Sequence, residues 1–332
     1  MKDLKIAFIP LQRLGDGVIS LVLANNLQEN GYQVTMYHSF MCQLNDWFDF
    51  DIKAYPEHNA LEAILSDYEV VLMDMCMPFV LSQTQAQQEN LSRKYIFYAV
   101  GNLNDEFVYD HTERLTKRLG KDSEVLFSAL AKSCRTIKFD KSNSMVDNMT
   151  QYCQQVLQLK TVSNQAGIKI PDELEFSKYN KRVVLAPTSS LEKKNWGSKN
   201  FIALARLLKS KAYEPVFAVA PDERAYWEEV LNDEFDLPEF TSIKIYSEYL
   251  YESLAFIGND SGGGHVASLM GVPVLTIVTS ARKLNFKWRP GWGNNTVVGP
   301  RFTFKWMGKR YWQAFLSSKK VFHEFKRLIA KM

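Results

Sequence analysis

The sequence lacks most of the patterns that assign a chain to a common class. Its four cysteines are scattered without a CxxC pair, so reduced thiols in the cytosol are expected. Its five histidines are far apart and show no metal-ligand spacing. No window approaches the ~20 apolar residues that span a bilayer, and the short apolar run near the N-terminus does not resemble a signal peptide. A cytoplasmic protein is expected.

Three catalytic signatures are also missing. There is no G-x-S-x-G elbow, and no loop has the glycine spacing of a Walker motif. The turn RLGDGVIS places Gly15 and Gly17 as a dinucleotide fingerprint would, but Ser20 occupies the third glycine position. The next predicted strand ends in Tyr37-His38-Ser39 and not in an acid, so a nicotinamide enzyme is not expected.

The net charge of +3 gives no indication of nucleic-acid binding.

What the sequence does contain is a strand, turn and helix pattern that occurs twice. KIAFIP, a glycine turn, a helical run and QVTMYH form one βαβ unit, and RVVLAP starts a second series after a linker. In that second series SIKIYS (242–247) is predicted as a short strand. The pattern predicts an α/β fold with two parallel-sheet domains. The expected parts are a first domain (1–160), a linker (161–180), a second domain (181–315) and a C-terminal helix (316–332).

Asp16 is the first candidate functional residue, because it lies in the turn between the first strand and its helix. Doubly wound folds place ligand-binding groups at such turns. An exposed carboxylate there suits general-base catalysis. The alternative is a structural role as the N-cap of the helix, where aspartate is favoured.

The loop APTSSLEKKNWGSKNF (186–201) is the second candidate and follows the first strand of the second domain. Thr188 and Ser189 offer hydroxyl donors, and Lys193 and Lys194 offer cations, which together suit an oxyanion or phosphate. A solvated basic loop is the alternative.

The third candidate is the segment FIGNDSGGGHVASLMG, in which three glycines precede a helical run. Free N–H groups at a helix start and the positive end of the helix dipole favour an anion. The glycines would let a diphosphate approach the backbone closely. A plain helix start is the alternative. The residues expected to surround this diphosphate are Asp260, Ser261, Gly262, Gly263, Gly264 and His265.

Two weaker patterns complete the sequence evidence. Asp49-Phe50-Asp51 matches the D-x-D of metal-dependent sugar transferases, but a match of two residues arises often by chance. Residues 282–312 interleave basic and aromatic residues, which is typical of a solvated surface, an acidic-glycolipid or anionic-membrane surface, or a single-strand nucleic-acid surface.

Together, RLGDGVIS, APTSSLEKKNWGSKNF and NDSGGGHVASLMGVPVL resemble the motifs of glycosyltransferase family 9, the ADP-heptose:lipopolysaccharide heptosyltransferases. They occur in the family's order over nearly the whole chain. The resemblance implies a GT-B fold, in which two Rossmann-like domains face a cleft and the final helix crosses back to the first domain. It also implies an inverting, metal-independent glycosyltransferase that needs no cofactor beyond its nucleotide-sugar co-substrate.

The resemblance further implies roles for single residues. Asp16 falls on the family's proposed catalytic base, and Lys194 on the lysine that contacts the donor phosphates. Thr188 and Ser189 fall on the hydroxyl pair, and Glu223 matches a nucleotide-ribose contact. The segment 260–265 falls on the donor-binding signature.

The implied reaction moves heptose from ADP-heptose to a lipopolysaccharide core acceptor. The implied partners are this nucleotide sugar and a glycolipid, with peripheral contact at the cytoplasmic face of the inner membrane left open and no nucleic acid expected. After VPVLTIV, however, the family commonly reads Gly-Pro-Thr-Asp-Pro where this chain reads VTSARKLNFKWRP. The sequence therefore leaves open another nucleotide sugar, a sugar-nucleotide 2-epimerase and a non-catalytic nucleotide-sugar-binding relative.

Overall fold

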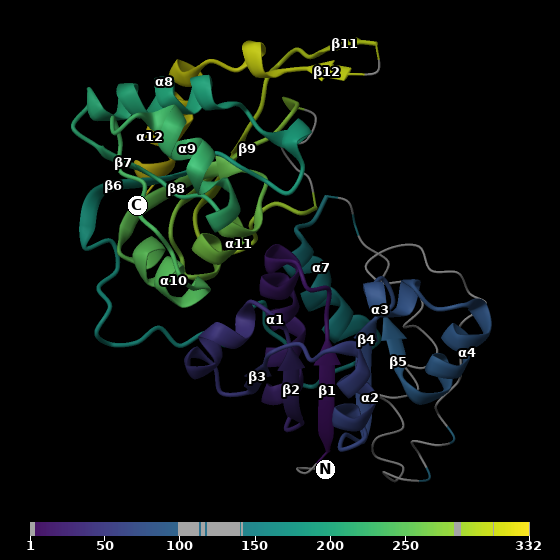
Figure 1. Cartoon of the computed structure of the whole chain (residues 1–332). Coiled ribbons are helices and arrows are strands. Elements are labelled where there is room, and N and C mark those ends of the chain that lie inside the picture. The colour runs from purple at the N-terminus through teal and green to yellow at the C-terminus, as the bar shows by residue number, and fades with distance from the viewer. Residues whose placement is uncertain are drawn as a thin grey trace. The chain divides into compact units, whose positions relative to one another are not determined.

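The computed structural model describes residues 4–98, 113, 117, 140, 142–281, 287–307 and 309–331. The chain folds as two compact units, one of residues 1–140 and 146–169 and the other of residues 141–145 and 170–332. Each unit contains a five-stranded parallel sheet with helices (Figure 1). The predicted α/β class with two parallel-sheet domains is confirmed.

The first unit has its strands in the order β3-β2-β1-β4-β5, and every neighbouring pair is parallel. β1 and β4 are neighbours in register, with Ile9 opposite Met73. The segments that follow these two strands therefore leave the same edge of the sheet. The elements are β1 (Lys5–Ile9), α1 (Leu14–Glu29), β2 (Gln33–Tyr37), a 3₁₀ segment (Met41–Trp47), β3 (Asp51–Lys53), α2 (His58–Leu65), β4 (Val70–Asp74), α3 (Pro78–Leu81), α4 (Gln85–Lys94), β5 (Ile96–Tyr98), α7 (Met145–Gln151) and a π segment (Tyr152–Val156).

Helix α1 is buried over almost its whole circumference, since every residue from 17 to 27 is buried. Such a helix needs partners for its polar side chains, because an unpaired buried amide is costly. Asn26 donates to the carbonyl of Ser163 and accepts from the N–H of Ser163, both at 2.9 Å. Asn30 donates to the carbonyl of Thr161 at 2.7 Å. The first half of the predicted linker is therefore hydrogen-bonded along α1.

The five-stranded sheet of the second unit has the order β10-β9-β8-β6-β7, and every neighbouring pair in it is parallel. β6 and β8 are neighbours, so the loop after β6 and the start of the helix after β8 leave the sheet side by side. The elements are β6 (Tyr179–Ala186), a 3₁₀ segment (Glu192–Lys194), α8 (Ser198–Lys209), β7 (Glu214–Phe217), a 3₁₀ segment (Pro221–Glu223), α9 (Arg224–Leu231), α10 (Ile243–Tyr251), β8 (Ser253–Asn259), α11 (Gly262–Leu269), β9 (Val274–Ile277), β10 (Asn295–Val298), β11 (Phe304–Trp306), β12 (Lys309–Tyr311), a 3₁₀ segment (Gln313–Phe315) and α12 (Ser318–Ile329).

One predicted strand is wrong. Residues 243–251 form helix α10, and the Ser242 hydroxyl caps it by accepting the N–H of Ile245 at 3.1 Å. The apolar alternation of Ile243 and Ile245 suggested a strand, but serine at the preceding position is a strong N-cap. Ile245 is 45% exposed on this helix.

Helix α12 belongs to the core of the second unit. Val321, Phe325 and Leu328 are fully buried and pack in one cluster with residues of α8 and the sheet. The spacing of these three residues places them on one helix face. That α12 also crosses to the first domain stays a prediction, as do the predicted domain boundaries.

Within the described part of the chain, no helix combines the length and apolarity needed to cross a bilayer.

Candidate functional site

The predicted site residues fall into two groups, one in each unit. The first group is at the carboxyl edge of the first sheet, where Asp16 lies in the first turn of α1. The N-cap of this helix is Arg13, and no side chain caps it, so the alternative of Asp16 as N-cap is wrong. Burial raises the pKa of Asp16, and the charge of Arg13 partly offsets that rise. A carboxylate with a raised pKa is a better proton acceptor than an ordinary one.

A second acid, which the sequence reasoning missed, lies at the same edge. Asp74 ends β4, the neighbour of β1, and its side chain is 1% exposed. Its Oδ1 accepts the N–H of Cys76 at 2.8 Å. Burial, helped by the negative charge of Asp16, raises the pKa of Asp74 to about 7. The carboxyl edge of the sheet thus holds two carboxyl groups, and burial raises the pKa of both. In the sequence, the feature that could have indicated Asp74 is its position as an acid at the end of an otherwise apolar strand.

His38 follows β2, and its ring packs against the first turn of α1. Its Nδ1 accepts the N–H groups of Phe40 and Met41, each at 3.2 Å. The proton of the neutral ring is therefore on Nε2, which lies 3.3 Å from the Arg13 carbonyl. Burial lowers the pKa of His38 to about 4, so the ring is neutral at physiological pH.

Gly17 explains how His38 comes so close to α1. A Cβ at position 17 would lie 2.2 Å from Nε2 of His38, which real structures do not tolerate. The second glycine of the turn is therefore required by packing against an imidazole.

The second group surrounds the start of α11 and the loop after β6 in the second unit. Nζ of Lys194 lies 2.8 Å from Oδ2 of Asp260, and both side chains are mostly but not fully covered. This ion pair joins two segments that are 66 residues apart in the sequence. The structure thus brings together Lys194 and Asp260, two of the charged residues predicted for the donor site.

His265 lies in the first turns of α11 and is 5% exposed. Its ring hydrogen-bonds the backbone of Trp288, and its Nδ1 has no partner among the described residues. Burial lowers the pKa of His265 to about 4, although the charge of Asp260 opposes that shift. A neutral imidazole whose Nδ1 can accept a hydrogen bond therefore lies near the Lys194–Asp260 pair, and buried polar atoms without a partner are few in folded proteins.

No side chain caps α11, and Ser261 stands at its N-cap position without such a bond. Among the described residues, no side chain hydrogen-bonds the first N–H groups of this helix, as an anion site requires. Gly263, however, faces another group. A Cβ there would lie 2.5 Å from the hydroxyl of Tyr246. The absence of a side chain at position 263 makes room for this phenol.

The loop after β6 is held rigidly by a residue that the sequence reasoning also missed. Asn259, at the end of β8, donates to the Pro187 carbonyl at 2.6 Å and accepts the N–H of Trp196 at 3.1 Å. Trp196 is fully buried, and its indole N–H donates to the Leu316 carbonyl at 3.0 Å. Lys194 therefore stands on an anchored loop.

The remaining predicted residues have less direct positions. The Ser189 hydroxyl lies 2.7 Å from Oδ1 of Asn195, a contact internal to the loop. Thr188 is half-buried and makes no hydrogen bond with the described residues. Oε2 of Glu223 accepts the N–H of Ala220 at 3.1 Å and so caps its own short helix.

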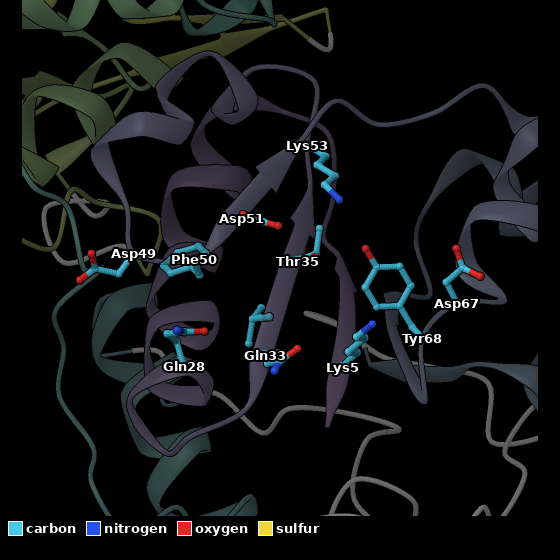
Figure 2. A pocket seen from close by; sticks show the side chains of 11 residues that line it. Lys5, Gln28, Gln33, Thr35, Asp49, Phe50, Asp51, Lys53, Asp67 and Tyr68 are labelled. Atoms are coloured by element: carbon cyan, nitrogen blue, oxygen red, sulfur yellow. The ribbon is translucent and has the colours of Figure 1, made fainter. Parts of the chain in front are cut away.

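A cavity of about 440 Å³ in the first unit contains none of the predicted site residues (Figure 2). Lys5, Gln33 and Asp51, which begin β1, β2 and β3, line it together with Tyr68. Its lining extends from Lys5 and Gln33, at the amino ends of β1 and β2, to Lys53, which ends β3. Asp49, the first acid of the D-x-D match, forms an ion pair with Lys169. The described residues contain no group of three histidine, cysteine or acidic side chains placed to hold a metal ion.

Comparison with known proteins agrees with this geometry. The profile of glycosyltransferase family 9 (heptosyltransferase) matches residues 114–301, more than half of the chain. The protein belongs to glycosyltransferase family 9.

Solved structures confirm the GT-B fold. A family 9 glycosyltransferase from Veillonella parvula superposes with a TM-score of 0.68 at 14% identity, covering 99% of this chain and 97% of that one. E. coli heptosyltransferase WaaC with ADP gives 0.64 at 13% identity, with coverage of 98% and 99%. E. coli ADP-heptose lps heptosyltransferase II gives 0.56 at 13% identity, with 99% of both chains covered. No curated protein matches the chain in sequence.

Proposed function

We propose that the protein is an inverting, metal-independent glycosyltransferase that moves a sugar from a nucleotide-diphosphate sugar to a glycolipid acceptor. ADP-heptose is the proposed donor and a lipopolysaccharide core the proposed acceptor, because the family is that of the heptosyltransferases and a related protein was solved with ADP. The observation that carries the proposal is the Lys194–Asp260 ion pair, which joins the lysine loop to the uncapped start of α11.

In this proposal the diphosphate binds at the start of α11. The N–H groups of the first turn and the ammonium of Lys194 neutralise the charge that grows on the leaving group as the glycosidic bond breaks. Asp260 holds the ammonium in place before the donor arrives. The free Nδ1 of His265 accepts a hydrogen bond from a donor hydroxyl. Stabilisation of this kind takes the place that a metal ion has in other sugar transferases.

Asp16 is the proposed general base. Its carboxylate removes the proton of the acceptor hydroxyl as that oxygen attacks the anomeric carbon from the face opposite the diphosphate. The attack inverts the configuration at that carbon. Asp74 lies at the same edge, and the negative charge of Asp16 adds to the rise of its pKa.

A transfer assay tests the proposal. Wild-type protein is given nucleotide sugars carrying ADP, UDP or GDP, with a lipid-A-core acceptor, in the presence of EDTA. We expect one donor to be consumed only when the acceptor is present, and product NMR to show an inverted anomeric centre. Conversion of the donor without acceptor would identify an epimerase and contradict the proposal.

Two substitutions assign the base. Asp16→Asn is expected to abolish transfer while donor binding in calorimetry is unchanged, because the amide cannot accept the proton. Asp51→Asn is the matched control, since Asp51 is an exposed acid in the same unit. Turnover in Asp16→Asn comparable to that of the control would remove Asp16 as the base.

A further inference from the structure

The charge of the chain is distributed very unevenly. Residues 261–332 contain 13 lysines and arginines and a single acid, Glu324. Residues 1–260 contain 27 lysines and arginines against 36 aspartates and glutamates. The small net charge of +3 therefore hides a strongly cationic C-terminal segment. A basic segment of this kind is attracted to anionic surfaces.

The same segment carries a concentration of exposed apolar side chains at the β11–β12 hairpin. Phe302 is 71% exposed, Phe304 56% and Met307 81%. Tyr311 and Phe315, at 43% and 50%, follow within eight residues of Met307. We call these five residues the hairpin patch. Side chains of this size are exposed together only rarely without a partner.

The β11–β12 hairpin is short, and residues at its base are hydrogen-bonded to the loop after β6, which carries Lys194. β11 and β12 pair in antiparallel register with Phe304 opposite Tyr311, and Figure 1 shows the two strands at the margin of the second unit beyond α8. At its base, the buried Trp312 donates its indole N–H to the Lys193 carbonyl at 3.2 Å. Gln313 donates to the Asn195 carbonyl at 3.3 Å. A surface that binds the patch would therefore lie close to the proposed donor site.

We propose that the hairpin patch docks the protein on an anionic phospholipid bilayer. Exposed phenylalanine and methionine side chains enter the boundary between headgroups and acyl chains, and the lysines and arginines of the C-terminal segment are attracted to the lipid phosphates. The proposal rests on the proposed function in one respect: a bilayer is where a glycolipid acceptor is presented.

Charge and side-chain type together favour the bilayer over other occupants. A second copy of the chain would bring two cationic segments together, which like charges oppose. Single-stranded nucleic acid stacks on flat aromatic rings, whereas the most exposed residue of the patch is Met307, an unbranched thioether. An anionic bilayer offers both negative charge and an apolar phase.

Co-sedimentation of the full chain with vesicles tests the proposal. One vesicle population is phosphatidylcholine alone, and in the other about a third of the lipid is phosphatidylglycerol. We expect binding to the anionic vesicles at least about tenfold tighter than to the neutral ones, with weakening as salt rises. Equal binding to both populations, or no binding to either, would overturn the proposal.

A triple variant, Phe302→Ser with Phe304→Ser and Met307→Ser, assigns the effect to the patch. We expect it to bind anionic vesicles at least about tenfold more weakly. The matched control replaces three apolar residues exposed elsewhere, Leu81, Tyr226 and Ile245, with serine and is expected to bind like wild type. Unchanged vesicle binding in the patch variant would overturn the proposal.

Three further readouts separate the alternatives. A lower unfolding midpoint in the patch variant would mean that the patch is covered within the chain. Concentration-dependent association in sedimentation velocity that only the patch variant loses would identify a second copy as the occupant. Patch-dependent binding of a single-stranded oligonucleotide with no vesicle binding would identify nucleic acid. Each would overturn the bilayer assignment, whereas nucleotide-sugar calorimetry, which the variant should leave unchanged, reports separately on the proposed function.

Discussion

Replacing Asp74 by asparagine should stabilise the protein, and by more as the pH rises. Asp74 is 1% exposed, and its pKa is raised from 3.8 to about 7, chiefly by burial. The folded protein therefore binds more protons than the unfolded chain between these two values, so its stability falls as pH rises through that window. Below the window Asp74 contributes no penalty, and above it the penalty is complete.

The size of the free-energy penalty follows from the difference between the two pKa values of Asp74. Each pH unit between the two pKa values corresponds to about 1.4 kcal/mol, which gives a full penalty of about 4 kcal/mol above pH 7. Less than half of this penalty is present at about pH 5. Asparagine cannot ionise, and its side-chain oxygen can still accept the N–H of Cys76 that Asp74 accepts at 2.8 Å. The gain in stability of Asp74→Asn over wild type should thus be about 2–3 kcal/mol larger at about pH 8 than at about pH 5.

Urea unfolding of both proteins at the two pH values measures this difference directly. Asp51→Asn is the control, because Asp51 is exposed. The difference in the free energy of unfolding between this variant and wild type should be nearly the same at both pH values. Two results would refute the reasoning that a buried carboxyl group titrates at this position. One is a difference in the free energy of unfolding between Asp74→Asn and wild type that does not change with pH, and the other is a loss of stability in the variant at about pH 8.

Two further substitutions test the packing beneath the candidate sites. Gly17→Ala places a methyl group 2.2 Å from Nε2 of His38, so we expect a loss of about 1–3 kcal/mol in urea unfolding as the imidazole is displaced. Asn259→Ala removes the partner of the Pro187 carbonyl and the Trp196 N–H in a buried position, and should cost about 2–4 kcal/mol with a matching drop in melting temperature. A change below about 0.5 kcal/mol in either variant would contradict the contact that it removes.

The sheet architecture could be predicted because its strands are buried on both faces. VVLMD of β4 and the apolar run of β6 are continuous apolar segments bounded by turns, and they are strands in the structure. The failure at 243–251 has a local cause. The alternation of Ile243 and Ile245 favours a strand, but the Ser242 cap fixes a helix there.

The candidate site could be predicted only in part. The motifs indicated Lys194 and Asp260 separately, and the structure joins them. Asp74 and Asn259 were missed because their importance comes from neighbours distant in sequence, namely β1 beside β4 and the loop after β6 beside β8. The contact of Gly263 with Tyr246 likewise depends on how α10 and α11 pack, and no sequence spacing records it.

The central claim is that the second unit holds a nucleotide diphosphate between the ammonium of Lys194 and the start of α11. Calorimetric titration of wild-type protein with ADP and with ADP-heptose, in EDTA, tests it most directly, with Lys194→Ala beside Lys193→Ala as the matched control. We expect saturable one-to-one binding that Lys194→Ala weakens at least about tenfold, as loss of a charge-assisted contact should, and that Lys193→Ala leaves nearly unchanged. Equal affinity in wild type and Lys194→Ala, or no binding of any ADP-, UDP- or GDP-linked sugar, would contradict it.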